Sequence, residues 1–206
     1  YLYIPVYKLQ ECKYKDIGKL VSTYVKLEGN EKVVGALIVK SFETYAFVVL
    51  ATKNGMIKKT SIPKFDISRF SKAIPAIKLK ENDELVSVNI AYENDNVVVV
   101  SRSGNYNRYS LEMLSDIAPR AMGVGGINVK NDELVGVAIE HSGPSELLIC
   151  SNKGYKRIHF ADLDFTSRNA KGNRLFKQTK TNPSSIIGVK TIASDTSLIY
   201  NDEKMT

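Results

Sequence analysis

A unit of about 50 residues recurs along this chain, and this recurrence limits the possible folds more than any other sequence feature. The acidic stretch 82–88 (Asn-Asp-Glu-Leu-Val-Ser-Val) returns at 131–137 as Asn-Asp-Glu-Leu-Val-Gly-Val, and a weaker copy lies at 30–35. In phase with these stretches, a glycine follows a short apolar run at three places: Gly55, Gly104 and Gly154. Because self-similarity at a fixed period is typical of repeat folds, we expect an array of equivalent units.

Within each unit, the apolar runs have the length and composition of β-strands. Residues 46–50, 97–100 and 147–150 are short, largely β-branched or aliphatic, and bounded by turn residues. Asn54-Gly55 is a hairpin dipeptide, because a type I′ turn needs a positive φ at both central positions. One short helical turn is expected near 111–114, and no long amphipathic helix is predicted. The sequence therefore predicts an all-β chain with about four strands per unit.

A period of this length with four strands per unit is typical of propeller blades. We expect one domain built of such blades, with the two ends of the chain pairing to close or nearly close the ring. The alternative that the pattern leaves open is a linear β array without closure. The expected division is a partial blade at 1–40, blades at 41–91, 92–140 and 141–193, and a closing or next-blade strand at 194–206.

Composition excludes some classes of protein and favours one kind of partner. The chain has 29 lysines and arginines against 22 acidic residues, a formal net charge of +7, which favours a polyanionic partner. No apolar run approaches the ~20 residues that a membrane helix requires. The start at Tyr1, without a signal peptide or an initiator Met, indicates a fragment of a longer protein. Cys12 and Cys150 form no motif, so we expect no disulfide and a cytoplasmic setting.

Two stretches resemble a known family. One is Pro-Arg-Ala-Met-Gly-Val-Gly-Gly-Ile-Asn-Val at 119–129, and the other is Lys-Asn-Gly-Met-Ile-Lys-Lys-Thr at 53–60. Both are similar to segments of the C-terminal domain of the A subunits of bacterial type IIA topoisomerases, DNA gyrase and topoisomerase IV. The resemblance covers about residues 41–193. It implies a β-pinwheel, a propeller-like ring of four-stranded blades in which neighbouring blades exchange a strand.

The resemblance favours topoisomerase IV over gyrase. Gyrase A subunits carry a Gln-Arg-Arg-Gly-Gly-Lys-Gly box, and this chain has no match to it. The nearest stretches are Ser-Arg-Asn-Ala-Lys-Gly at 167–172 and Pro-Arg-Ala-Met-Gly at 119–123. A gyrase wrapping domain remains the nearest alternative.

The family resemblance also implies a function. It implies a module that binds and bends duplex DNA without sequence preference and presents it for ATP-dependent strand passage, in decatenation and supercoil relaxation. The expected partners are duplex DNA, the ATPase B subunit, which carries the ATP site, and the remaining parts of the parent polypeptide, in the bacterial cytoplasm at the nucleoid. The catalytic tyrosine is expected outside this chain, so the chain alone is not an enzyme. No cofactor is expected here, since ATP and Mg would bind elsewhere in the parent complex.

Basic residues recur at matching positions in successive units, as a surface that follows a bent duplex requires. One set follows the turn glycines, and a second set lies in the loops before the next strand. A lysine or arginine on an exposed strand can also serve only solubility or edge protection. For Tyr106 and Tyr155, beside the turns, cross-strand packing is favoured over stacking on DNA. The candidate DNA-binding residues are Lys58, Lys59, Arg108, Lys156 and Arg157 in the first set, and Arg69, Lys72, Arg120, Arg168, Lys171 and Arg174 in the second.

No active site or metal site is predicted. Adjacent acids such as Asp83 and Glu84 point to opposite faces of a strand, so we expect Asp83 and Asp132 to form turns by bonding nearby backbone amides. His141 and His159 lack partners at ligand spacing. A protein-interaction propeller is the alternative of another class. The chain contains no Trp, and so no WD signature supports it.

Overall fold

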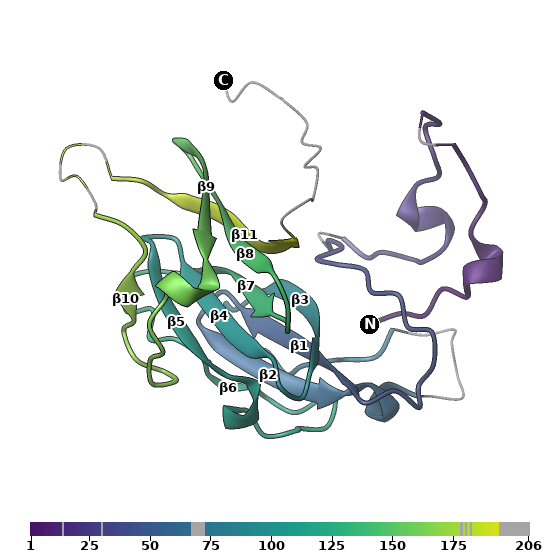
Figure 1. Cartoon of the computed structure of the whole chain (residues 1–206). Coiled ribbons are helices and arrows are strands. Elements are labelled where there is room, and N and C mark those ends of the chain that lie inside the picture. The colour runs from purple at the N-terminus through teal and green to yellow at the C-terminus, as the bar shows by residue number, and fades with distance from the viewer. Residues whose placement is uncertain are drawn as a thin grey trace.

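The computed structural model describes residues 1–13, 15–29, 31–66, 73–177, 179, 181 and 183–193. Their regular structure consists of eleven β-strands and five short 3₁₀ turns, in agreement with the predicted all-β class (Figure 1). The 3₁₀ turns are η1 (Val6–Lys8), η2 (Val21–Thr23), η3 (Ile62–Phe65), η4 (Leu111–Met113) and η5 (Phe160–Asp162). The predicted closing strand at 194–206 lies outside the described residues.

The strands form three antiparallel sheets, each built around a β-hairpin. The first sheet has the order β3 (Leu85–Tyr92), β1 (Ala46–Thr52), β2 (Met56–Ser61), β6 (Val124–Gly125). The second has the order β7 (Leu134–Glu140), β4 (Asn96–Ser101), β5 (Asn105–Ser110), β10 (Asn173–Arg174). The third has three strands: β11 (Ile186–Ala193), β8 (Ser145–Ser151) and β9 (Gly154–His159).

Neighbouring sheets exchange a strand. β6 follows the hairpin of the second sheet in the chain, yet it pairs with β2 of the first sheet, Ile57 opposite Val124. β10 likewise follows the hairpin of the third sheet and pairs with β5 of the second, Tyr106 opposite Asn173. The chain is therefore a β-pinwheel, as the family resemblance implied.

In each sheet, one edge strand lies towards the centre of the array and the strand at the opposite edge lies towards the outside. The strands β3, β7 and β11 pack against one another from sheet to sheet, so they form the inner side. At the opposite ends of the first two sheets, β6 and β10 form the outer edges. In Figure 1, β6 and β10 lie at the periphery of the sheets.

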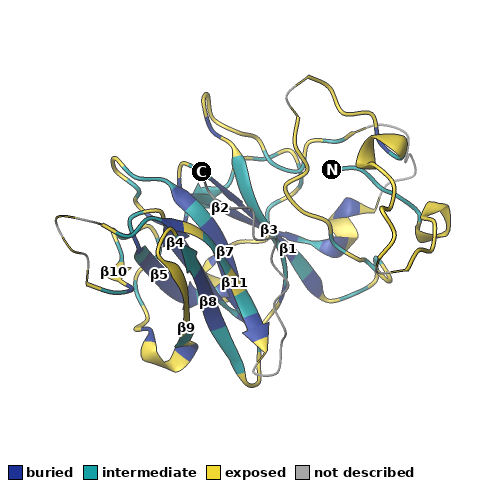
Figure 2. Cartoon of the chain, turned by 90° about the horizontal axis from the view of Figure 1, so that it is seen from above, coloured by how far each residue is buried: buried dark blue, intermediate teal, exposed yellow. Residues whose placement is uncertain are grey.

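Apolar side chains fill the spaces between the sheets. One cluster joins Val49 and Ile57 of the first sheet to Val97 and Val99 of the second. A second cluster joins Val98 and other residues of the second sheet to the third. Since alternate residues of β4 point into both clusters, β4 is buried on both faces and appears dark blue in Figure 2.

The acidic turns fasten the hairpins. Asp83 accepts hydrogen bonds from the backbone N–H of Glu84 and of Asn54, and from the Thr52 hydroxyl at 2.7 Å. Asp132 makes the corresponding bonds to Ser103 and Glu133. The predicted turn role of both aspartates is confirmed, and each also ties its turn to the hairpin of its own unit.

Before β1, the chain forms loops and two 3₁₀ turns beside the first sheet (Figure 1). Its first residue is anchored: the amino group of Tyr1 donates to the Ile74 carbonyl, and the N–H of Ile74 donates to the Tyr1 carbonyl. Many apolar side chains of this segment are exposed, including Tyr7, Ile17 and Leu20.

Candidate nucleic-acid interface

Two loops run along the outer edges of the sheets, and we call residues 115–123 and 164–172 the outer-edge loops. Each is held by the strand of the preceding sheet: the N–H of Ile117 donates to Lys59, and the N–H of Thr166 donates to Arg108. Arg120 and Asn169, at matching points, have positive φ angles of 69° and 63°. The same local fold therefore occurs on two successive blades.

Each outer-edge loop has one acid near its start, Asp116 or Asp164, and its cations lie in the acid-free stretch that follows. No aspartate or glutamate occurs from 117 to 131 or from 165 to 193. Arg120 and Lys171 are exposed, and neither side chain makes a hydrogen bond or ion pair within the described part of the chain. Their full charge is therefore available to a partner.

Two further arginines are fixed in place by the neighbouring blade. The Arg168 guanidinium donates to the Gly125 carbonyl on β6, and the Arg174 guanidinium donates to the Ser103 carbonyl at 3.2 Å. A guanidinium has five N–H donors, so each arginine retains donors for a phosphate. We call Arg120, Arg168, Lys171 and Arg174 the outer-edge cations.

The structure places two other predicted cations, Lys58 and Lys59, inside the protein. Lys58 is 0% exposed, and its amine donates to the carbonyls of Ala76 at 2.8 Å and Ala121 at 3.2 Å. Lys59 is buried, donates to the Leu111 carbonyl and lies 4.8 Å from the centre of the Phe47 ring. Burial lowers the pKa of both lysines.

Arg108, at the position of Lys59 in the next unit, is also buried. Its guanidinium makes two hydrogen bonds to the Glu140 carboxylate, at 2.8 and 2.9 Å, and one to the Leu163 carbonyl at 2.6 Å. The ring of Phe165 covers it at 4.1 Å. These contacts use the groups that a phosphate would need, so Lys58, Lys59 and Arg108 act as structural cations.

Lys156 and Arg157 differ from their buried counterparts because they are exposed on β9. Arg157 forms an ion pair with Glu146, and the Lys156 amine lies 5.7 Å from the centre of the Phe176 ring. Both line a groove of about 270 Å³ that also includes Arg174 and His159. Arg69 and Lys72 lie outside the described residues.

The two tyrosines beside the turns have different surroundings. Tyr106 is buried, and its hydroxyl accepts the N–H of Asp164 at 3.0 Å, which confirms its packing role. Tyr155 lies opposite Cys150 on β8 and is 57% exposed, so its cross-strand packing role stays a prediction.

Sequence reasoning missed two features. Lys177 is an exposed cation in the same acid-free stretch as the outer-edge cations, and the absence of acids from 165 to 193 was the signal for it. Asn107 donates to the carbonyls of Gly126 and Ala170, just as Lys58 donates to Ala76 and Ala121. No sequence pattern indicates this role, because it requires the positions of two distant loops.

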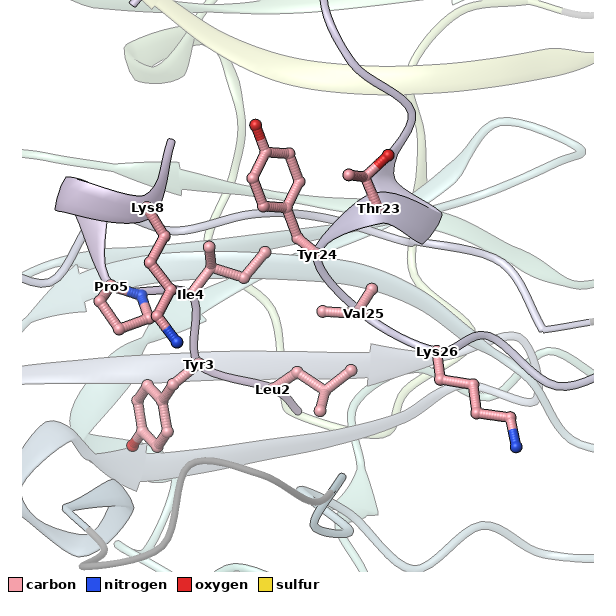
Figure 3. Close-up of a pocket in the computed structure, with 9 residues that line it drawn as sticks. All are labelled: Leu2, Tyr3, Ile4, Pro5, Lys8, Thr23, Tyr24, Val25 and Lys26. Carbon is pink, nitrogen blue, oxygen red and sulfur yellow. The ribbon is translucent and has the colours of Figure 1, made fainter. Parts of the chain in front are cut away.

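A second cavity, of about 340 Å³, lies in the segment before β1 (Figure 3). Figure 3 shows Leu2, Ile4, Pro5 and Val25 around it, with the amines of Lys8 and Lys26 at its margin. It brings together no nucleophile with a general base. Among the described residues, no group of three or more His, Cys, Asp or Glu side chains is placed to hold a metal ion, and no helix is long and apolar enough to cross a membrane.

Comparison with protein families gives one match to nearly the whole chain. The family model described as "DNA gyrase C-terminal domain, beta-propeller" matches residues 1–40, 46–91, 95–139 and 145–193. The DNA topoisomerase 4 A subunit of Staphylococcus aureus strain MSSA476 is 39% identical over 197 residues, 95% of this chain. That of strain NCTC 8325 / PS 47 is 38% identical over the same length. The chain spans about a quarter of these relatives, 24% of each.

Comparison with solved structures agrees. A crystal structure of the C-terminal domain of DNA topoisomerase IV superimposes with a TM-score of 0.83 at 26% identity, covering 93% of this chain and 60% of that one. A DNA gyrase A C-terminal domain superimposes with a TM-score of 0.54 at 16% identity, covering 86% and 76%. The gyrase likeness concerns the fold alone, and the chain is more similar to the topoisomerase IV domain.

Proposed function

Because the chain belongs to the DNA gyrase C-terminal domain, beta-propeller family, we propose that it binds duplex DNA through its outer-edge cations. The observation that carries this proposal is the repeated outer-edge loop. On two successive blades it presents cations at the periphery, within a stretch of the sequence that contains no acids.

The proposed binding acts on phosphates. Lysine and arginine contacts to phosphate oxygens position a duplex without reading its sequence, and they release counterions. Equivalent loops on successive blades would meet the duplex at successive points around a curved surface. A duplex that contacts all of them must bend, so sequence preference would follow flexibility rather than base identity.

In the parent enzyme, we propose that the domain presents DNA for ATP-dependent strand passage and contributes no chemistry itself. The catalytic tyrosine and the ATP and Mg sites of the ATPase B subunit belong to other parts of that assembly. The Staphylococcus aureus relatives, at 38% and 39% identity, are topoisomerase IV A subunits, and the chain lacks the gyrase box. Decatenation and relaxation are therefore the proposed tasks, rather than wrapping for supercoiling.

The test measures affinity for a random duplex over a series of salt concentrations, with fluorophores at both DNA ends to report bending. We compare the wild-type chain with the Arg120→Ala, Lys171→Ala double variant, since these two side chains have no internal bonds to lose among the described residues. Removing two phosphate contacts should reduce the slope of log affinity against log salt by about 2 and weaken binding about tenfold or more.

The matched control is the Lys40→Ala, Lys190→Ala double variant, which loses the same charge from exposed sites outside the outer-edge loops. It should keep the wild-type slope. Equal losses in both double variants would mean that net charge alone attracts DNA, and would sink the proposed interface. Absence of binding at low salt would instead favour a protein-interaction propeller.

A further inference from the structure

One aromatic side chain of the second outer-edge loop lies outside the apolar clusters. The structure describes six of the seven phenylalanines, and five of these six belong to a cluster between or beside the sheets, or pack against one. The sixth is Phe165, which is 60% exposed. A large apolar ring on the same loop as the cations therefore has no role in the core.

The loop can be built without an apolar side chain at this place. The N–H groups of Ile117 and Thr166 make matching bonds to β2 and β5, so Phe165 corresponds to Asp116 on the first outer-edge loop. Asp116 forms an ion pair with Lys64 at 2.9 Å, as a surface acid does. An exposed ring at this point is thus particular to the second loop, and a partner would account for it.

The strand β5 holds the ring in a fixed position. On either side of Phe165, the N–H of Asp164 donates to the Tyr106 hydroxyl at 3.0 Å, and the N–H of Thr166 donates to the Arg108 carbonyl at 2.8 Å. The Arg108 guanidinium covers one face of the ring, 4.1 Å from its centre, and is itself held by three hydrogen bonds. A side chain that is already ordered loses less conformational entropy when it binds.

The same loop fixes the ring relative to an exposed cation. Lys171 follows Phe165 in this loop, and between them the N–H of Asn169 donates to the Gly126 carbonyl at 3.1 Å. Asp164, directly before the ring, is an exposed acid. A phosphate is attracted to Lys171 and repelled at Asp164, so the surroundings of the ring suit an uncharged part of a DNA backbone.

The geometry limits which uncharged part of DNA the ring can meet. Bases in a duplex are stacked on one another, and a side chain reaches their faces only as a wedge between two base steps. Because Arg108 covers one face of Phe165, the ring cannot lie between two base pairs with both of its faces stacked. The apolar surface that a duplex presents beside its phosphates is deoxyribose.

We infer that Phe165 packs against the deoxyribose of a duplex whose phosphates bind Lys171 and the other outer-edge cations. The inference rests on the proposed function and adds an apolar contact to it. Every nucleotide carries the same sugar, so this contact has no sequence preference. It also releases no counterions, so it contributes affinity that does not vary with salt.

The first test compares Phe165→Ala with the wild type on a random duplex over a series of salt concentrations. Affinity should fall about fivefold at every salt concentration, as for the loss of a small apolar contact. The slope of log affinity against log salt should not change. A smaller slope would mean that the substitution acts through the cations, contrary to the inference.

Two variants are the controls. Tyr45→Ala removes an aromatic ring that is 94% exposed and lies outside the outer-edge loops, and it should bind DNA like the wild type. Phe165→Tyr keeps the ring and should keep the affinity. Urea unfolding of each variant checks that the fold is retained. Equal losses in Phe165→Ala and Tyr45→Ala would contradict a specific contact.

The second test uses the wild-type chain, so it does not depend on the folding of a variant. The chain is labelled with ¹³C in its phenylalanines and mixed with an unlabelled duplex. Isotope-filtered nuclear Overhauser effects should connect the ring protons of Phe165 to deoxyribose protons, and Phe165→Tyr identifies the ring signal. Contacts to base protons alone, or none from Phe165 in the DNA-bound chain, would overturn the inference.

Failure of this inference differs from failure of the proposed function. If the Arg120→Ala, Lys171→Ala variant keeps the wild-type slope, the proposed interface itself fails. If that variant loses slope while Phe165→Ala binds as tightly as the wild type, only the deoxyribose contact is refuted. If Phe165→Ala weakens binding only to a duplex with one unpaired base, the ring stacks on a base and the inference is wrong.

Discussion

Burial of a lysine amine is costly unless each of its N–H donors finds an acceptor, and Lys58 is a fully buried case. Two carbonyls from different loops accept its hydrogen bonds. Desolvation nevertheless lowers the pKa of Lys58 below its ordinary value of 10.5. The equivalent residue in the next unit is a neutral amide, Asn107, which makes the same pair of contacts without a charge.

The lowered pKa of Lys58 predicts how stability varies with pH. Between the lowered folded-state pKa and 10.5, the unfolded chain holds more protons at this site than the folded chain. The contribution of Lys58 to the free energy of unfolding therefore increases as pH rises through that window. Lys58→Gln keeps N–H donors but does not titrate, so the wild type should gain stability relative to the variant as pH rises through that window.

Urea unfolding of both proteins at several pH values measures this difference. Other titrating groups, including Lys59, are common to both proteins and cancel in the comparison. A difference in unfolding free energy that stays constant with pH would contradict the prediction.

At the scale of elements, each outer-edge loop needs a glycine where it passes close to the backbone of β2 or β5 in the preceding sheet. Gly172 has a φ of +85°, and a Cβ there would lie 2.4 Å from the Tyr106 carbonyl oxygen. Gly123, its counterpart on the first sheet, would place a Cβ 2.5 Å from the Ile57 carbonyl oxygen. Both close approaches set the path by which the loop reaches the edge of the preceding sheet.

Gly172→Ala should therefore destabilise the chain by more than backbone strain alone. The control is Gly143→Ala, where φ is +111° but no atom lies within 4 Å of a Cβ. A positive φ costs an L-residue about 1–2 kcal/mol, and forced backbone shifts add about 1–3 kcal/mol at Gly172. Thermal or urea unfolding measures the stability of both variants. Equal losses of stability would show that the surroundings of Gly172 shift to relieve the close contact.

The hairpins of the sheets could be predicted from the sequence, and the exchanged strands could not. The runs at 46–50, 97–100 and 147–150 have strand composition, and β1, β4 and β8 include them. By contrast, β6 and β10 have two residues each, and Asn173 and Arg174 have no β preference. Their pairing depends on the loop that delivers them, so only the family resemblance indicated the exchange.

The same reasoning explains the mixed outcome for the candidate cations. Lys58 and Lys156 occupy equivalent positions and have the same chemistry, yet one is buried and the other exposed. Their difference comes from the segment that covers β2, a property of the neighbouring unit rather than of the residue. A search for basic residues in phase therefore finds structural cations and surface cations together.

For the whole molecule, the shared cores predict a gradient of local stability. Residues Val97 to Val100 of β4 are 0% exposed and belong alternately to the two inter-sheet clusters. β9 has one packed neighbour, β8, and an uncovered outer side among the described residues. Local opening requires less free energy where fewer apolar contacts are lost.

Amide hydrogen exchange of the free chain should therefore be slowest in β4 and faster in β9 than in β2 or β5. The comparison of β9 with β5 is the informative one, since both strands have six residues and the same place in their hairpins. Protection of β9 equal to that of β5 would mean that its edge is covered in solution.

The exchange of strands also has a consequence for the order in which the protein is made. A ribosome releases the chain from its N-terminus, and here each of the first two sheets is completed by an outer strand that is synthesised after the sheet's own hairpin. β2 ends at Ser61, but its outer neighbour β6 is at Val124–Gly125. In the same way β5 ends at Ser110, and its outer neighbour β10 is at Asn173–Arg174. A nascent chain that stalls between two units therefore carries an unfinished blade, and completion of one unit depends on translation of the next.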